Sequence, residues 1–197
     1  TLCHFSKGIS LSNKGQFALD DFNQYFSKVK QLFEDLVMPY AARTRHKGES
    51  RLYTQLKNKF KSLELLAKDA SELSKHKIVQ NYPINENMGL TADFLLKNGI
   101  YHLSEVIDYN VNNTQSKLKE TSLKMMTFME SKKTLLDEVN CYFVYSATPK
   151  KESEVIQHLN LAESYSNKMF NINSTDDFKQ YIAMVSELTQ TEIPLLH

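Results

Sequence analysis

The chain has 197 residues, of which 41% are hydrophobic and 24% are charged, and its 24 basic residues nearly balance its 23 acidic ones. This composition is sufficient for a folded core and excludes a disordered or collagen-like chain. No apolar run is long enough to span a membrane, so we expect no membrane partner. The two cysteines, Cys3 and Cys141, are too few for a disulfide framework, which favours a cytoplasmic setting.

Helices are predicted in the first and last parts of the chain. We predict helices over five ranges, namely 18–38, 49–75, 114–136, 152–169 and 175–189, and in the first two the hydrophobic residues recur every three or four positions. In the third of these helices we expect four residues to face inward: Leu118, Met125, Met129 and Leu136. The chain is therefore predicted to contain an N-terminal helical segment with a basic connector (1–48) followed by one larger domain (49–197).

The basic connector continues into a segment, residues 43–61, where seven basic residues stand against the single acid Glu49. Such a cluster is typical of a surface that contacts phosphates, and it is equally typical of a solvated face that offsets acidic segments elsewhere. Arginine is scarce, with three arginines against 21 lysines, which argues against bidentate reading of bases. The candidate nucleic-acid-binding residues are Arg43, Arg45, Lys47, Arg51, Lys57 and Lys61.

Between the helices the hydrophobic pattern indicates strands. Residues 77–82 are predicted to form a short strand that ends at Pro83, and residues 141–145 form a continuous apolar run, as in a strand buried on both faces. Residues 90–96 and 100–109 flank Asn-Gly, the strongest short signal for a β-hairpin. We therefore predict an α/β fold of the α+β type, with a mixed central sheet flanked by helices.

The length of the hairpin loop decides where two carboxylates lie. A three-residue loop pairs Lys97 with Tyr101 and places Asp93 directly opposite Glu105, about 5 Å away. A two-residue loop pairs Lys97 with Ile100 instead and moves Glu105 to the other face of the sheet. Only the first register lets the two carboxylates share an ion.

The predicted order of one helix, three strands, a helix and a strand resembles the core of the PD-(D/E)xK nuclease superfamily, the restriction-endonuclease-like proteins. The resemblance covers about residues 49–146. It implies an aspartate on the second strand and an acid with a following lysine on the third. The matching positions are Asp93 in Thr-Ala-Asp-Phe-Leu and Glu105 in Ser-Glu-Val-Ile-Asp-Tyr, whereas the lysine of the motif falls at Ile107. Three lysines are candidates to replace it: Lys97 at the hairpin end, and Lys117 or Lys124 on the next helix.

The resemblance implies a site that holds Mg²⁺ or Mn²⁺ and acts on nucleic acid, DNA rather than RNA. Asp93 and Glu105 would bind the cation, since magnesium prefers oxygen ligands and neutralises charge on a scissile phosphate. Asp108 would be a supporting acid, and Lys97 or Lys117 would take the place of the absent lysine. A role in bacterial or phage defence, or in DNA processing, follows from the same resemblance.

Two alternatives stay open. In the first, the nuclease-like scaffold has lost catalysis and keeps only a binding role. In the second, the carboxylates are ordinary sheet residues and the chain is a non-enzymatic interaction module, which binds a protein partner or a second copy of itself.

Overall fold

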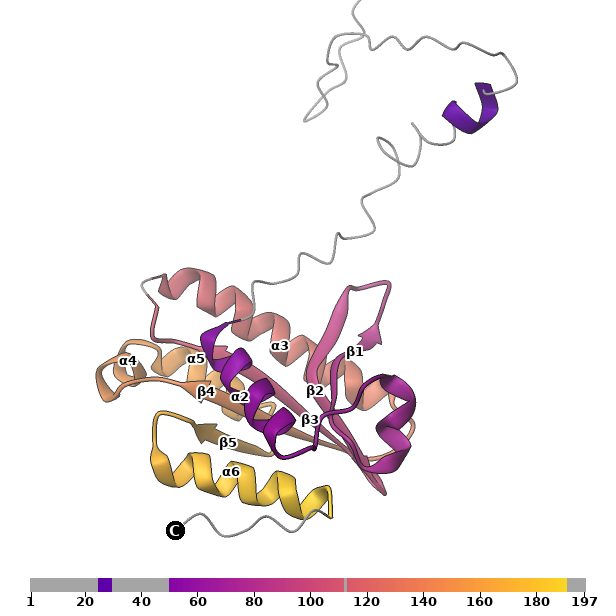
Figure 1. Cartoon of the computed structure of the whole chain (residues 1–197). Helices are drawn as coiled ribbons and strands as arrows, with labels where there is room; N and C mark the ends of the chain where they lie inside the picture. Colours follow the sequence, from indigo (N-terminus) through magenta and orange to yellow (C-terminus); the bar gives the residue numbers. More distant parts are fainter. Residues whose placement is uncertain (1–24, 30–49, 112, 191–197) are drawn as a thin grey trace, which may run out of the picture. The chain divides into compact units, whose positions relative to one another are not determined.

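A five-stranded mixed sheet forms the centre of the protein in its computed structural model, which describes residues 25–29, 50–111 and 113–190 (Figure 1). The first three strands form an antiparallel meander, and the last two run parallel to the third. The strands lie across the sheet in chain order: β1 (Val79–Asn85), β2 (Leu90–Asn98), β3 (Ile100–Asp108), β4 (Val139–Ser146) and β5 (Lys168–Asn171). The predicted fold class, a mixed sheet flanked by helices, is confirmed.

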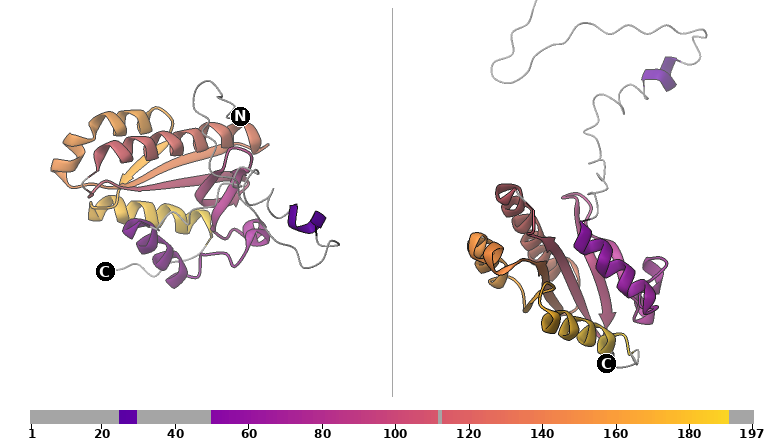
Figure 2. Two further views of the ribbon diagram at one scale, coloured as in Figure 1. Left: turned by 90° about the horizontal axis from the view of Figure 1, so that it is seen from above. Right: turned by 60° about the vertical axis from the view of Figure 1, so that its left-hand side comes forward.

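Helices cover both faces of this sheet (Figure 2). One face carries α3 (Thr114–Thr134) and α5 (Ile156–Glu163). The opposite face carries α2 (Arg51–Ser62) and α6 (Thr175–Leu188). The short helix α4 (Pro149–Glu154) comes just before α5 in the chain. Each face has its own hydrophobic core. On the α3 face the core contains Ile107 and Phe128, and on the α2 face it contains Phe60, Phe94 and Tyr181.

The hairpin between β2 and β3 has the register that the three-residue loop predicts. Lys97 pairs with Tyr101, and Asn98 pairs with Ile100 across Gly99 alone. Gly99 has a φ of 72°, in the left-handed region that glycine adopts without steric strain. The alternative pairing of Lys97 with Ile100 is therefore wrong, and Glu105 stays on the same face of the sheet as Asp93.

The elements before the hairpin differ from the prediction in two places. The helix predicted for 49–75 ends at Ser62, because Glu64 turns left-handed with a φ of 57°, and a separate 3₁₀ helix, η2, follows at Ala70–Lys75. The strand predicted to end at Pro83 continues to Asn85. Pro83 is tolerated because β1 is an edge strand, where one side of the backbone needs no ladder partner.

Further along, the helix predicted for 152–169 is two helices, α4 and α5, divided at Val155, and the last residues of that range begin β5. The helix predicted for 18–38 falls largely outside the described residues; residues 25–29 are described and are helical. The chain divides into two units, Thr1–Arg43 and Thr44–His197, and the sheet belongs to the second. Within the described ranges, no helix is both long enough and apolar enough to cross a membrane.

Candidate functional site

Strands β2 and β3 are paired over only part of their length. Their shared register ends at Phe94 and Ser104, after which β2 continues beside β1 and β3 continues beside β4. Asp93 and Glu105 are the next residues on the two strands, so both lie where the strands part. The backbone N–H of Val106 donates to Asp93 Oδ2 at 2.7 Å. A carboxylate thus satisfies a backbone donor just beyond the end of the shared ladder.

Helix α3 presents a partly polar stripe to this point. The helix begins after Asn113, whose Oδ1 accepts a hydrogen bond from the backbone N–H of Ser116 at 3.0 Å, as an N-cap residue does. The buried stripe of α3 has the spacing of one helix face and includes Thr121, Lys124, Met125, Phe128 and Ser131. A lysine therefore faces the sheet beside apolar core residues.

Helix α3 buries a different face from the one predicted. Of the four residues expected inward, only Met125 is buried, while Leu118 is 41%, Met129 is 43% and Leu136 is 100% exposed. Since each residue advances the helix by about 100°, the buried face is turned by roughly a quarter turn from the predicted one. This rotation is what brings Lys124 against the carboxylates.

Asp93, Glu105 and Lys124 form one charged cluster, which we call the carboxylate–lysine cluster. Lys124 Nζ donates to Glu105 Oε2 at 2.6 Å and also to Asp93 Oδ2. The side chains of Lys124 and Glu105 are 4% and 1% exposed, and that of Asp93 is 16% exposed. The cluster is thus closed on the side of Lys124 and Glu105, and solvent reaches it mainly at Asp93.

The charges in the cluster stabilise one another. Burial alone would lower the pKa of Lys124, but the nearby Asp93 and Glu105 raise it by more, so the net shift is upward and the amine is a charged ammonium. Two carboxylates around one ammonium leave a net charge of −1 in a largely dry environment.

The donor set fits a hard divalent cation. The two carboxylates come from adjacent strands and both reach one point, the position of the Lys124 ammonium. Magnesium is commonly held by one or two carboxylates, with water and substrate phosphate oxygens completing its coordination. The described part of the chain contains no group of three or more acidic, histidine or cysteine side chains placed to hold a metal. Within the described residues, this point offers two carboxylates, those of Asp93 and Glu105.

The other predicted site residues lie apart from this cluster. Lys97 pairs with Asp137 at 2.8 Å, and its ammonium lies over the ring of a neighbouring tyrosine. Lys117 pairs with Glu120 at 2.8 Å, seven residues before Lys124 on the same face of α3. Asp108 accepts the backbone N–H of the residue two positions later at 3.0 Å and, by strand alternation, points to the face opposite Glu105. Among the three candidate lysines, only Lys124 joins Asp93 and Glu105.

Two residues that the sequence analysis did not single out border the cluster. Tyr109, at the end of β3, is 1% exposed, and its hydroxyl shares a 2.7 Å hydrogen bond with Thr121 Oγ1 on α3. Burial raises the pKa of Tyr109 to about 12; Thr121 and Lys124 oppose this rise and Glu120 adds to it. The charges of Glu120 and Lys124 therefore both lie within electrostatic reach of one tyrosine. Lys117, Thr121 and Lys124 are four and three residues apart on α3, and this spacing is the sequence signal that could have placed Thr121 on the same helix face as the candidate lysines.

The predicted phosphate-binding residues lie elsewhere. Arg43, Arg45 and Lys47 fall outside the described residues. Arg51, Lys57 and Lys61 belong to α2, with Arg51 and Lys61 exposed. Helix α2 covers the face of the sheet opposite α3 (Figure 2). The cations of α2 and the carboxylate–lysine cluster therefore lie on different faces.

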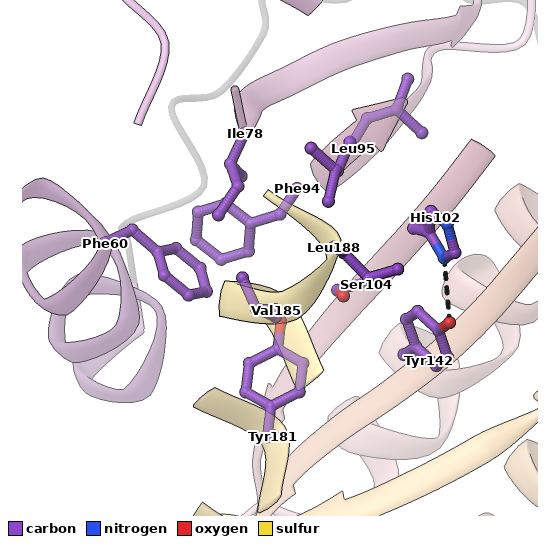
Figure 3. A pocket seen from close by; sticks show the side chains of 11 residues that line it. Phe60, Ile78, Phe94, Leu95, His102, Ser104, Tyr142, Tyr181, Val185 and Leu188 are labelled. Carbon is purple, nitrogen blue, oxygen red and sulfur yellow. Dashed lines mark hydrogen bonds between the residues drawn. The ribbon is translucent and has the colours of Figure 1, made fainter. Parts of the chain in front are cut away.

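A small cavity of about 10 Å³, partly open to the surface, lies between the sheet and the helices α2 and α6 (Figure 3). This volume is about what one water molecule needs, so it leaves no room for a substrate. His102 and Ser104 of β3 and Tyr142 of β4 line it, together with apolar side chains, and His102 Nδ1 lies 2.9 Å from the Tyr142 hydroxyl oxygen. We interpret this cavity as part of the core of the α2 face, separate from the carboxylate–lysine cluster.

Two buried histidines are expected to make the fold less stable in acid. His102 and His158 are each 7% exposed, and burial lowers the pKa of both below 6.5. Because the unfolded chain binds these protons more readily, the free energy of unfolding should fall as the pH drops below about 6.5, by at most about 1.4 kcal/mol per pH unit for each histidine. Thermal unfolding at pH 7.5, 6.5 and 5.5 measures this slope. The double variant His102→Gln/His158→Gln should flatten it, and an unchanged slope in that variant would contradict the assignment.

Comparison of the chain with protein-family models, with curated proteins and with solved structures finds no match. Function is therefore inferred from the geometry of the carboxylate–lysine cluster and from the order of the elements that build it.

Proposed function

We propose that the protein processes nucleic acid as a divalent-metal-dependent nuclease of the PD-(D/E)xK kind, with its site at the carboxylate–lysine cluster. One observation carries the proposal: Asp93, Glu105 and Lys124, from three different elements, meet at the point where two strands of the sheet part. The order of elements around this point, from α2 through β1, β2 and β3 to α3 and β4, is the order on which the resemblance rests.

Each member of the cluster has a role in this proposal. Asp93 and Glu105 would hold Mg²⁺ or Mn²⁺. Once bound, such an ion neutralises charge on a scissile phosphate and lowers the pKa of a coordinated water. Lys124, from α3, takes the place of the lysine that the superfamily carries on the third strand, where this chain has Ile107. Its ammonium supplies a positive charge beside the attacking water or the phosphate. In this proposal a nucleic acid would approach from the side of Asp93, which is part-exposed.

A cleavage assay with matched variants tests the proposal. Wild-type protein is incubated with single- and double-stranded DNA and with RNA, in Mg²⁺, in Mn²⁺ and in a chelator. We expect metal-dependent cleavage, of DNA before RNA, that falls at least about 100-fold in Asp93→Asn and in Glu105→Gln, because each loses a charged metal ligand.

Lys97→Met is the matched control, since Lys97 forms an exposed ion pair away from the cluster. It should cleave at nearly the wild-type rate. Circular dichroism establishes that each variant is folded before its rate is compared. If wild type and Asp93→Asn show the same residual cleavage, the nuclease proposal is wrong. A chain that then forms a stable dimer or captures a protein partner would be the non-enzymatic interaction module instead.

A further inference from the structure

The ammonium of Lys124 stands at the point where a metal ion would have to bind. It contacts Glu105 Oε2 at 2.6 Å and is also hydrogen-bonded to Asp93 Oδ2, so one oxygen of each carboxylate is directed at the same nitrogen. Lys124 is 4% exposed and Glu105 is 1% exposed, so little space surrounds the ammonium. The cluster therefore already contains a cation, supplied by the chain itself.

A second cation cannot share this point. Magnesium binds carboxylate oxygens at about 2.1 Å. A magnesium ion bound by the same two oxygens would lie within a few ångströms of the ammonium, with no anion between them, and two like charges at that distance repel strongly where little water screens them. The two cations therefore exclude each other from the pair of carboxylates.

The chain offers a second position for the displaced ammonium. Side chains on a helix lean toward its N-terminus, and residues four apart lie on the same face. Glu120 lies one turn before Lys124 in that direction, where it already pairs with Lys117 at 2.8 Å. A different rotamer of the four-carbon stem would carry the ammonium from the carboxylates of the strands toward that of the helix.

From these observations we propose that Lys124 competes with the metal ion and holds the site closed until the ion displaces it. The proposal depends on the proposed function, because it concerns the same metal site, and it adds how that site is regulated. The closed state is the ion-paired cluster of the structure. In the open state the metal binds to Asp93 and Glu105 while Lys124 is withdrawn, within reach of a phosphate.

Metal affinity, measured without any nucleic acid, tests the competition. Calorimetric titration with Mn²⁺ is carried out on wild type, Lys124→Met, Lys97→Met and the double variant Asp93→Asn/Lys124→Met. We expect Lys124→Met to bind Mn²⁺ at least about tenfold more tightly than wild type, because the competing charge is gone. Lys97→Met should match wild type, and the double variant should lose the gain. Equal or weaker binding by Lys124→Met, or no binding by either protein, would overturn the proposal.

A measurement on the wild-type protein covers the case in which Lys124→Met does not fold. A buried, hydrogen-bonded ammonium exchanges its protons slowly, so Lys124 should give a side-chain ¹H–¹⁵N signal, identified by its loss in Lys124→Arg. Saturating Mg²⁺ should abolish that signal as the ammonium leaves the carboxylates. A signal that persists unchanged when the metal site is full would overturn the proposal.

The two proposals fail in different experiments. Tighter Mn²⁺ binding by Lys124→Met without cleavage by wild type would support the competition and reject the nuclease. Metal-dependent cleavage by wild type with unchanged affinity in Lys124→Met would support the nuclease and reject the competition.

Discussion

Replacing Lys124 by methionine should lower the free energy of unfolding by about 3–5 kcal/mol in the absence of divalent metal. The substitution keeps most of the side-chain volume but removes the ammonium between Asp93 and Glu105, which leaves a buried carboxylate and a part-exposed one facing each other. Urea denaturation at neutral pH in a chelating buffer measures the change. A loss of less than about 1 kcal/mol would show that the cluster is hydrated and contributes little to stability.

Two matched variants separate the charge effect from general damage. Lys97→Met removes a lysine whose ion pair with Asp137 is more than one-third exposed on both sides, and it should cost at most about 1 kcal/mol. The triple variant Asp93→Asn/Glu105→Gln/Lys124→Met removes all three charges together. It should recover much of the stability lost in Lys124→Met, because no buried charge remains without a partner.

Replacing Phe94 by alanine should lower the free energy of unfolding by about 3–5 kcal/mol, through a different mechanism. Phe94 is 2% exposed, and its ring stacks on Tyr53 at a centroid distance of 4.8 Å and meets the ring of Phe60 edge-on at 5.1 Å. The truncation leaves a cavity between β2 and α2 that the surrounding rings cannot fill. Thermal or urea unfolding measures the loss.

Leu136→Ala is the control for this second change. Leu136 is fully exposed just beyond the end of α3, so its truncation should alter stability by no more than about 0.5 kcal/mol. If Phe94→Ala were as mild as Leu136→Ala, the packing between α2 and the sheet would be much looser than the ring distances indicate.

The sequence predicts the sheet better than it predicts the site. Asn98-Gly99 locates the hairpin because only a few residue types accept its backbone angles, and the apolar run 141–145 locates a buried strand because both of its faces need cover. Both are local signals. The strand that passes through Pro83 is predicted less well, since a proline is acceptable only once β1 is known to be at the edge.

The site depends on the rotation of one helix, and here local pattern is misleading. Leu118, Met129 and Leu136 have the spacing of a core stripe, yet the structure exposes them and buries Thr121 and Lys124 instead. Burial of a lysine is favourable only because it meets two carboxylates from strands that are far from it in the sequence. A window of neighbouring residues therefore cannot reveal that the lysine is buried. The sequence alone leaves Lys124 as one of three candidates to replace the lysine of the motif, and only the contacts with Asp93 and Glu105 distinguish it.

The distance along the chain between the members of the carboxylate–lysine cluster affects the order in which the protein folds. Asp93 and Glu105 are 31 and 19 residues from Lys124 along the chain, so neither hydrogen bond can form until the hairpin and α3 have come together. Contacts of such long sequence separation are acquired late, because the connecting chain must first lose its freedom. A nascent or truncated polypeptide that ends before α3 would therefore expose two neighbouring negative charges without their counter-ion.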